Sequence, residues 1–188
     1  FPFSGAKVAA PFLDYEALLA SAPEKFDYAP HEEDDPVSMC YTSGTTGRPK
    51  GVVYSHRSMV LHAYMVNQAA ALGLTPHDAV MPVVPMFHAN AWGLPYAATM
   101  AGAELVFPGQ YSADPAALAS LIEEERVTFT AGVPTVWMGL LAYLKDHDAD
   151  LSSLRALVGG GSAVPRALIE ALGGRGVEVW QGWGMTET

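Results

Sequence analysis

Short apolar runs alternate with longer helical patterns along most of the chain. The apolar runs have the length of buried strands and lie at 79–84, 105–107, 128–131, 155–158 and 177–180. Proline opens two of the intervening helical segments, at Asp114-Pro115 and at Pro134. Strands separated by helices connect through right-handed crossovers into a parallel sheet. We therefore predict an α/β fold with a doubly wound, largely parallel sheet and flanking helices, which binds ligands beyond the carboxyl ends of its strands.

A polar loop precedes these strands and lies between two apolar runs, 37–41 and 52–54. Seven of its ten residues are Gly, Ser or Thr, and two are cationic. The loop reads Thr42-Ser43-Gly44-Thr45-Thr46-Gly47-Arg48-Pro49-Lys50-Gly51. Glycine permits positive φ, so successive N–H groups can turn toward one anion, and Lys50 adds a full positive charge. The pattern is typical of a phosphate-binding loop in a hairpin-like unit. A helix capped by Ser55 should follow and end near Leu72.

The loop differs from the nucleoside triphosphate loop G-x-x-x-x-G-K-[ST]. Counting from Gly44, Pro49 occupies the second glycine position, and Gly51 follows Lys50 where Ser or Thr is required. An ordinary Gly/Thr surface turn is the alternative for a loop of this composition. The fixed order of Gly, hydroxyl and Lys residues favours the phosphate-binding interpretation.

Four motifs in this chain together resemble those of the acyl-adenylate-forming superfamily: acyl-CoA synthetases, luciferases and peptide-synthetase adenylation domains. The first motif is the loop at 42–51. The others, in the family's order, are Val84-Pro85-Met86-Phe87-His88 with Ala89-Asn90-Ala91-Trp92, Gly160-Gly161-Ser162-Ala163-Val164-Pro165, and Gln181-Gly182-Trp183-Gly184-Met185-Thr186-Glu187-Thr188. The family usually has Tyr where this chain has Trp183. The chain is most like medium- or long-chain fatty acyl-CoA synthetases, and the resemblance runs from about residue 37 to residue 188.

The resemblance implies nucleotide contacts for many of these residues. In the family the glycine-rich loop grips the β- and γ-phosphates of ATP, the Gly160 turn lines the adenine and acyl pocket, and the last motif contacts adenine and phosphate. The implied nucleotide-contacting residues are Thr42, Ser43, Gly44, Thr45, Thr46, Gly47, Lys50, Gly160, Gly161, Ser162, Gln181, Gly182, Trp183, Gly184 and Thr186. For the Gly160 segment, a plain tight turn before a helix is the alternative.

The resemblance also implies a magnesium site with Glu187 and Thr42 as ligands. Mg²⁺ prefers one or two protein oxygens together with phosphate oxygens and water. An ordinary surface carboxylate is the alternative for Glu187. The surrounding motif favours the ligand role.

Two residues in the second motif are candidates for contact with the acid substrate. The family's residue equivalent to His88 lies at the acyl carboxylate and the nucleotide, and we assign His88 and Lys50 as catalytic. A lone His beside apolar residues is more often a satisfied core residue. Trp92 matches the tryptophan that gates the acyl tunnel of fatty acyl-CoA synthetases, although an aromatic residue near a helix start is usually core.

The residues present suit one reaction in particular. A carboxylic acid is ionised at pH 7, so its attack on the α-phosphorus of ATP needs charge stabilisation and no general base. We therefore expect an acid–thiol ligase that forms acyl-AMP and then acyl-CoA, with ATP, Mg²⁺ and CoA. The alternatives are another adenylating ligase with an aryl or amino acid substrate, a catalytically idle nucleotide-binding module, or an unrelated phosphate-loop NTPase.

Composition limits the partners and the surroundings of the protein. The net charge is −10, so nucleic acid and anionic membranes are unfavourable partners. Prolines and polar residues interrupt the uncharged stretch 79–103, so we expect no integral membrane segment. The single cysteine, Cys40, cannot form an internal disulfide and fits a reducing cytoplasm. The sequence leaves the oligomeric state open, with a homodimer as one alternative.

The chain has two predicted parts. Residues 1–36 form an irregular leading segment with one short helix near Asp14 to Ala20, and residues 37–188 belong to an N-terminal AMP-binding domain. The chain begins without Met and ends inside a motif, and the family's members are several hundred residues long. We expect it to be an internal fragment of a larger adenylating domain that lacks the C-terminal domain. We also expect it to be inactive in isolation.

Overall fold

The computed structural model describes residues 10–43 and 47–188, and the chain divides between Glu32 and Glu33 into two compact units. The first unit contains helix α1 (Tyr15–Ser21), close to the predicted bounds. Asp14 caps this helix, because its Oδ1 accepts a hydrogen bond from the Ala17 N–H at 3.0 Å.

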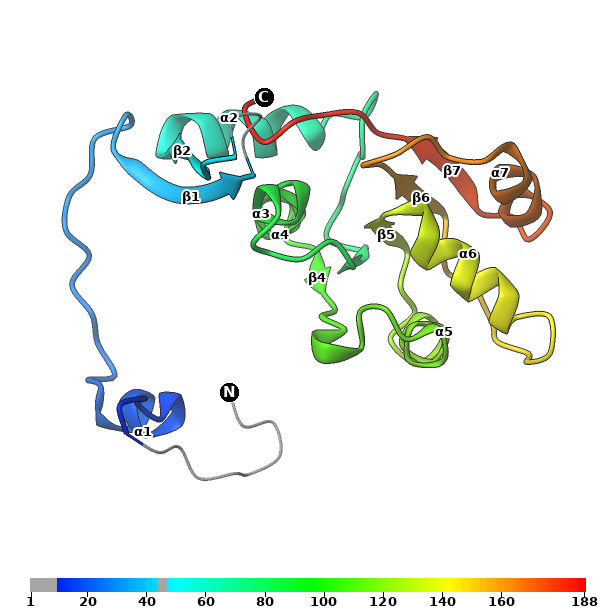
Figure 1. Ribbon diagram of the computed structural model, residues 1–188, viewed down its shortest axis with the longest axis horizontal. Helices are drawn as coiled ribbons and strands as arrows, with labels where there is room; N and C mark the ends of the chain where they lie inside the picture. The colour runs from blue at the N-terminus through cyan, green and yellow to red at the C-terminus, as the bar shows by residue number, and fades with distance from the viewer. Residues whose placement is uncertain (1–9, 44–46) are drawn as a thin grey trace. The chain divides into compact units, whose positions relative to one another are not determined.

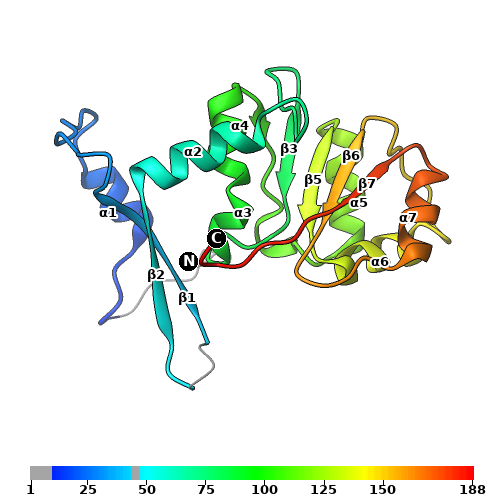
Figure 2. The same cartoon turned by 90° about the horizontal axis from the view of Figure 1, so that it is seen from above.

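The second unit begins with an antiparallel hairpin of strands β1 (Pro36–Thr42) and β2 (Lys50–Ser55), which forms a sheet of its own (Figures 1 and 2). The register pairs Ser38 with Tyr54, Cys40 with Val52 and Thr42 with Lys50. Because directly paired residues share a face of the ladder, these six side chains lie on one side. Cys40 is buried there, so this is the side that packs on the rest of the unit.

Helix α2 (His56–Val66) follows the hairpin directly. Ser55 is its N-cap, as predicted, and reciprocal hydrogen bonds between Ser55 and Ser58 form a capping box. The prediction that the helix continues to about Leu72 is wrong. The side-chain amide of Asn67 donates to the Ala97 carbonyl at 2.8 Å, and the Leu72 N–H folds back onto the Val66 carbonyl, also at 2.8 Å. The tertiary contact and this turn end the helix at Val66.

A five-stranded parallel sheet forms the centre of the unit, with the order β4-β3-β5-β6-β7. Its strands are β3 (Ala79–Pro82), β4 (Glu104–Leu105), β5 (Phe129–Gly132), β6 (Ala156–Gly159) and β7 (Glu178–Gln181). The chain passes from β3 to β4 on one side and returns to β5 on the other. The carboxyl ends of β3 and β5 therefore mark the topological switch point, where sheets of this kind bind ligands.

Helices cover both faces of this sheet (Figure 1). Helices α2 and α4 (Leu94–Ala101) pack on one face, in a core cluster that includes Ala63, Leu94 and Phe129. The other face carries α5 (Pro115–Glu124), α6 (Pro134–Tyr143) and α7 (Arg166–Gly173), in a second cluster. Crossovers on both faces make the sheet doubly wound, which confirms the predicted fold class. A short 3₁₀-helix, η1 (Gly109–Tyr111), lies between β4 and α5.

A buried polar network joins the amino ends of the strands. Asp78 is 7% exposed and accepts hydrogen bonds from Arg155 at 3.0 Å, from the Thr128 hydroxyl at 2.6 Å and from Thr75. Arg155 also donates to the Leu72 carbonyl. Burial alone would raise the pKa of Asp78, but these hydrogen bonds outweigh it and lower the pKa from 3.8 to about 2. The network stabilises the edge of the sheet opposite the switch point.

Candidate functional site

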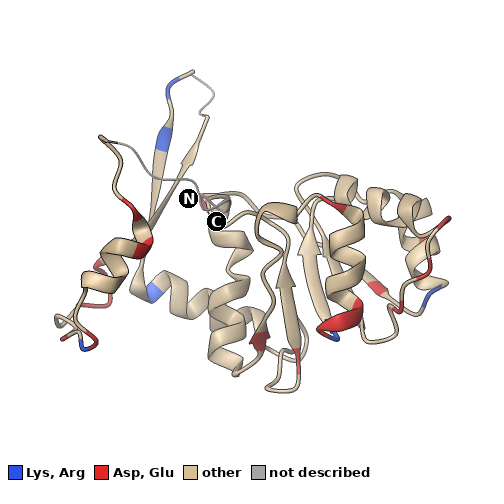
Figure 3. Cartoon of the chain, turned by 90° about the horizontal axis from the view of Figure 1, so that it is seen from below, with Lys and Arg blue, Asp and Glu red and all other residues tan. Residues whose placement is uncertain are grey.

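The hairpin places two residues that are predicted to contact the nucleotide opposite each other, at the two ends of the glycine-rich loop. Thr42 ends β1, Lys50 begins β2, and the two are directly paired on the inward-facing side. Gly47 has φ +78°, a conformation that favours glycine. Gly44, Thr45 and Thr46 lie outside the described residues. Arg48 and Lys50 are exposed, and Figure 3 shows basic residues on this otherwise weakly charged hairpin.

A left-handed helical turn follows β3 at the switch point. This turn, α3 (Ala89–Trp92), has φ between 45° and 55° at each of its four residues, and Gly93 continues it at φ 72°. Each non-glycine residue in this conformation costs roughly 1–2 kcal/mol, so surrounding contacts must hold the turn. The sequence analysis did not predict it, although Asn and Gly are the residues that adopt this conformation most readily.

Asn90 anchors the left-handed turn to the hairpin. Its side chain is 7% exposed, and its Oδ1 accepts a hydrogen bond from the Ser38 hydroxyl at 2.8 Å. The Cys40 thiol lies 3.8 Å from the same oxygen, and the Asn90 amide contacts the Met59 sulfur at 3.9 Å. Cys40 is thus a buried structural residue. These contacts of Asn90 explain how the second motif keeps its position beside the hairpin that carries the first motif.

His88 and Trp92 lie at the two ends of this turn. His88 is the exposed N-cap residue, and its N–H donates to the Pro85 carbonyl at 2.9 Å. Trp92 is half-buried, and its ring rests against Gly160. A Cβ at Gly160 would lie 2.8 Å from Trp92 Cη2 and 3.2 Å from the Gly182 carbonyl oxygen. The second, third and fourth motifs therefore meet at Gly160.

Backbone hydrogen bonds join the segments that follow β5, β6 and β7. The Gly160 N–H donates to the Gly132 carbonyl at 3.3 Å, and the Gly182 N–H donates to the Gly159 carbonyl at 2.8 Å. The Gln181 side-chain oxygen accepts from the Val164 N–H at 3.3 Å. Gly161 has φ +76°, and the neighbouring Ser162 is exposed. The third and fourth motifs consequently form one continuous surface at the carboxyl ends of β6 and β7, called here the Gly160 edge.

A hydrogen bond from Tyr54 ties the end of the fourth motif to the hairpin. The Tyr54 hydroxyl of β2 donates to the Thr186 carbonyl at 2.5 Å. Burial raises the pKa of Tyr54, with further contributions from Cys40 and from the nearby Glu187. The phenol therefore stays protonated and able to donate. Trp183 and Glu187 in the same motif are exposed, Trp183 at 82%.

The donor set fits a magnesium ion that arrives with a triphosphate. Glu187 offers one exposed carboxylate and Thr42 one hydroxyl, and Mg²⁺ takes one or two protein oxygens when phosphates supply others. No group of three or more His, Cys, Asp or Glu side chains gathers at one place within residues 10–43 and 47–188. A cage built from protein ligands alone is thus absent from the described part of the chain.

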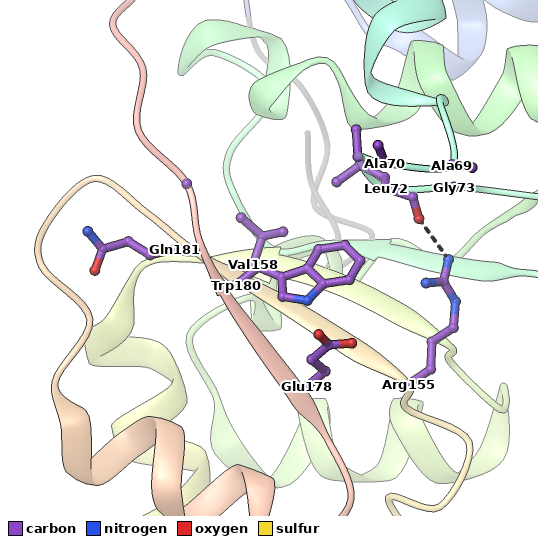
Figure 4. Close-up of a pocket in the computed structure, with 11 residues that line it drawn as sticks. Ala69, Ala70, Leu72, Gly73, Arg155, Val158, Glu178, Trp180 and Gln181 are labelled. Atoms are coloured by element: carbon purple, nitrogen blue, oxygen red, sulfur yellow. Dashed lines mark hydrogen bonds between the residues drawn. The ribbon is translucent and has the colours of Figure 1, made fainter.

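An open cleft of about 770 Å³ lies between the turn after α2 and strands β6 and β7 (Figure 4). Val158 and Trp180 form part of its wall, together with Arg155 and Glu178. Of the predicted site residues, the cleft includes Gln181 and Gly182. It does not include the hairpin, His88 or Trp92, so its size does not mark the place where the motifs meet. Among the described helices, none has the length and apolarity needed to cross a bilayer.

Comparison with known proteins assigns the family. The profile of the "AMP-binding enzyme" family matches residues 6–188. The chain belongs to the AMP-binding enzyme family. This confirms the resemblance drawn from the four motifs, because the match includes all of them.

Two similar relatives are named as fatty acid ligases. The chain is 54% identical over 171 residues to a long-chain-fatty-acid–CoA ligase of Thermus thermophilus, covering 87% of the chain and 31% of the relative. It is 47% identical over 176 residues to a medium-chain-fatty-acid–CoA ligase of Ectopseudomonas oleovorans, covering 93% and 32%. The N-terminal domain of FACL13 from Mycobacterium tuberculosis, in an inhibitor-bound crystal structure, matches with TM-score 0.82 and 32% identity over 92% of the chain and 42% of that domain. The chain thus spans about a third of the length of its curated relatives.

Several residues that organise the site have no role in the sequence analysis. Tyr54, Ser38 and Asn90 make the contacts that bring the hairpin to the sheet. For Tyr54 one signal was available: it lies four residues after Lys50 in a strand, so the two share a face.

Proposed function

We propose that the full-length protein containing this chain is an acid–thiol ligase that activates a fatty acid in two steps. The fatty acid carboxylate attacks the α-phosphorus of ATP, which gives acyl-AMP and releases pyrophosphate. The sulfur of CoA then attacks the acyl carbon, which gives acyl-CoA and releases AMP and a proton. The observation that carries the proposal is the convergence of the four motifs through Ser38–Asn90, Trp92–Gly160 and Tyr54–Thr186.

The residues in this arrangement stabilise charge rather than transfer protons. In the first step an anion approaches a polyanion, and positioned donors and cations are the effective catalysts for such a reaction. We assign Lys50 and the glycine-rich loop to the β- and γ-phosphates, because Lys50 is exposed and begins β2 at the loop. We assign Thr186 to the nucleotide phosphate and His88 to the acid carboxylate. Bound Mg²⁺, held by Glu187 and Thr42, would neutralise phosphate charge.

The Gly160 edge is the proposed adenine and acyl pocket. Gly160 is buried and packed against Trp92, while Gly161 and Ser162 are exposed beside it. We infer that adenine contacts the backbone of this turn and Trp183, and that Trp92 borders the acyl chain. The names of the two fatty acid ligases support a medium- or long-chain acid.

Pyrophosphate exchange tests the proposed function. The full-length protein would be incubated with ATP, Mg²⁺ and labelled pyrophosphate, and with fatty, aryl or amino acids in turn. We expect label to enter ATP only with an acid present, and fastest with a medium- or long-chain fatty acid. Exchange confined to aryl or amino acids would select the other adenylating ligases. Nucleotide binding without exchange for any acid would refute the proposal.

A further inference from the structure

We propose that Tyr54 is a positioning residue that sets the place of the Glu187 carboxylate relative to the glycine-rich loop at residues 42–51. The proposal rests on the proposed function for the identity of the ligand, magnesium-bound ATP. It is carried by the hydrogen bond from the Tyr54 hydroxyl to the Thr186 carbonyl, which spans 132 positions of the sequence.

The strand geometry links Tyr54 to the loop. Residues four apart in a strand lie on the same face, so Tyr54 points to the same side of β2 as Lys50. The register places Lys50 opposite Thr42 and Tyr54 opposite Ser38 on that side. At about 3.4 Å per residue, the Cα atoms of Lys50 and Tyr54 lie roughly 14 Å apart along β2. Strand β2 therefore connects the loop directly to the residue that contacts the Thr186 carbonyl.

The peptide geometry links Tyr54 to the metal ligand. The Thr186 carbonyl belongs to the planar peptide unit that ends at the Glu187 Cα. Fixing this oxygen therefore restricts the position from which the Glu187 side chain leaves the backbone. The other hydrogen bonds found at the end of this motif are local and join Met185 with Thr188. Tyr54 thus supplies a long-range anchor that this exposed segment does not supply for itself.

The surroundings of the hydroxyl suit this role. Tyr54 is half-buried, with Cys40 and Val52 on the same side of the hairpin. The negative charge of Glu187 is close enough to influence Tyr54, so anchor and ligand lie near each other. Removing only the hydroxyl leaves the ring in place. Tyr41 provides a matched control, because it lies on the opposite side of the same hairpin and is 67% exposed.

The test compares Tyr54→Phe with Tyr41→Phe in the full-length protein. Calorimetric titration with ATP, without acid or CoA, gives the dissociation constant with Mg²⁺ and with EDTA. We expect Tyr54→Phe to weaken ATP binding in Mg²⁺ by about 2- to 12-fold, the range that one hydrogen bond carries, and to have a smaller effect in EDTA. We expect Tyr41→Phe to bind as wild type does. Hydrogen–deuterium exchange of residues 183–188 should be faster in Tyr54→Phe only.

The outcomes separate the two proposals. Wild-type ATP binding without pyrophosphate exchange would refute the proposed function and leave the Tyr54 comparison measurable. Equal dissociation constants for the two variants would overturn the Tyr54 proposal even if wild-type exchange is rapid. Faster hydrogen exchange with an unchanged dissociation constant would also overturn it, because the anchor would then serve the chain end and not the ligand. A loss of ATP affinity in Tyr54→Phe that is as large in EDTA as in Mg²⁺ would overturn the Tyr54 proposal too.

Discussion

Substituting Gly160 by Ala tests the contact at which three motifs meet. The new Cβ would lie 2.8 Å from Trp92 Cη2 and 3.2 Å from the Gly182 carbonyl oxygen. Carbon atoms normally approach to about 3.5–4.0 Å, so the indole must shift by roughly 0.7 Å or more. Forcing one carbon into such a contact typically costs about 1–3 kcal/mol. If this cost falls on acid activation, kcat/KM for the fatty acid decreases by about 5- to 150-fold.

A double-mutant cycle measures the contact in the full-length protein. Pyrophosphate exchange would be followed for Gly160→Ala, Trp92→Ala and the double variant, with Gly173→Ala as a control. A Cβ at Gly173 meets nothing within 4 Å, so its substitution should leave kcat/KM unchanged. In the Trp92→Ala background the effect of Gly160→Ala should shrink to about twofold, because the clashing ring is gone. An equal effect of Gly160→Ala in both backgrounds would refute the reasoning.

Three further predictions concern other parts of the structure. Lys50→Ala and Glu187→Ala should each slow pyrophosphate exchange by about 10²-fold while the melting temperature changes little, and near wild-type exchange in both variants would contradict their assigned roles. Trp92→Ala should change the preference for acyl chain length more than the affinity for ATP; an unchanged chain-length profile with a sharply lower melting temperature would make Trp92 a core residue only. The ionised Asp78 should stabilise the folded state by about 2 kcal/mol, from 1.36 kcal/mol per pKa unit, because its pKa is lowered from 3.8 to about 2. Its contribution is nearly complete above about pH 5 and is lost as the pH falls from there through the folded-state pKa of about 2. Asp78→Asn should therefore lower the free energy of unfolding at pH 7 and weaken its dependence on pH in the acidic range; an unaltered acidic pH dependence would contradict this.

The sequence predicts the sheet and the hairpin because their signals are local. Apolar runs of strand length, prolines at helix starts and the Ser55 cap each depend on neighbouring residues, and the structure contains the corresponding elements. The end of α2 is different. The hydrogen bond from Asn67 to the Ala97 carbonyl joins residues 30 positions apart, so the sequence around Asn67 does not predict it.

The site follows the same division between local and distant signals. The motifs identify the candidate residues, but the contacts that assemble them are long-range. Asn90 keeps its left-handed conformation beside Ser38, 52 positions away, and Thr186 is held by Tyr54 across 132 positions. Neither pair can be found from spacing in one sequence, because both depend on how the hairpin packs against the sheet.

The products formed from ATP test the central claim most directly. The full-length protein would be mixed with Mg²⁺, ATP and decanoate without CoA, and the products would be identified by mass spectrometry in a single turnover. The account predicts decanoyl-AMP and pyrophosphate, because the carboxylate attacks the α-phosphorus at the site where the four motifs meet. ADP with phosphate or acyl phosphate, or unchanged ATP in a protein that binds it, would contradict the account.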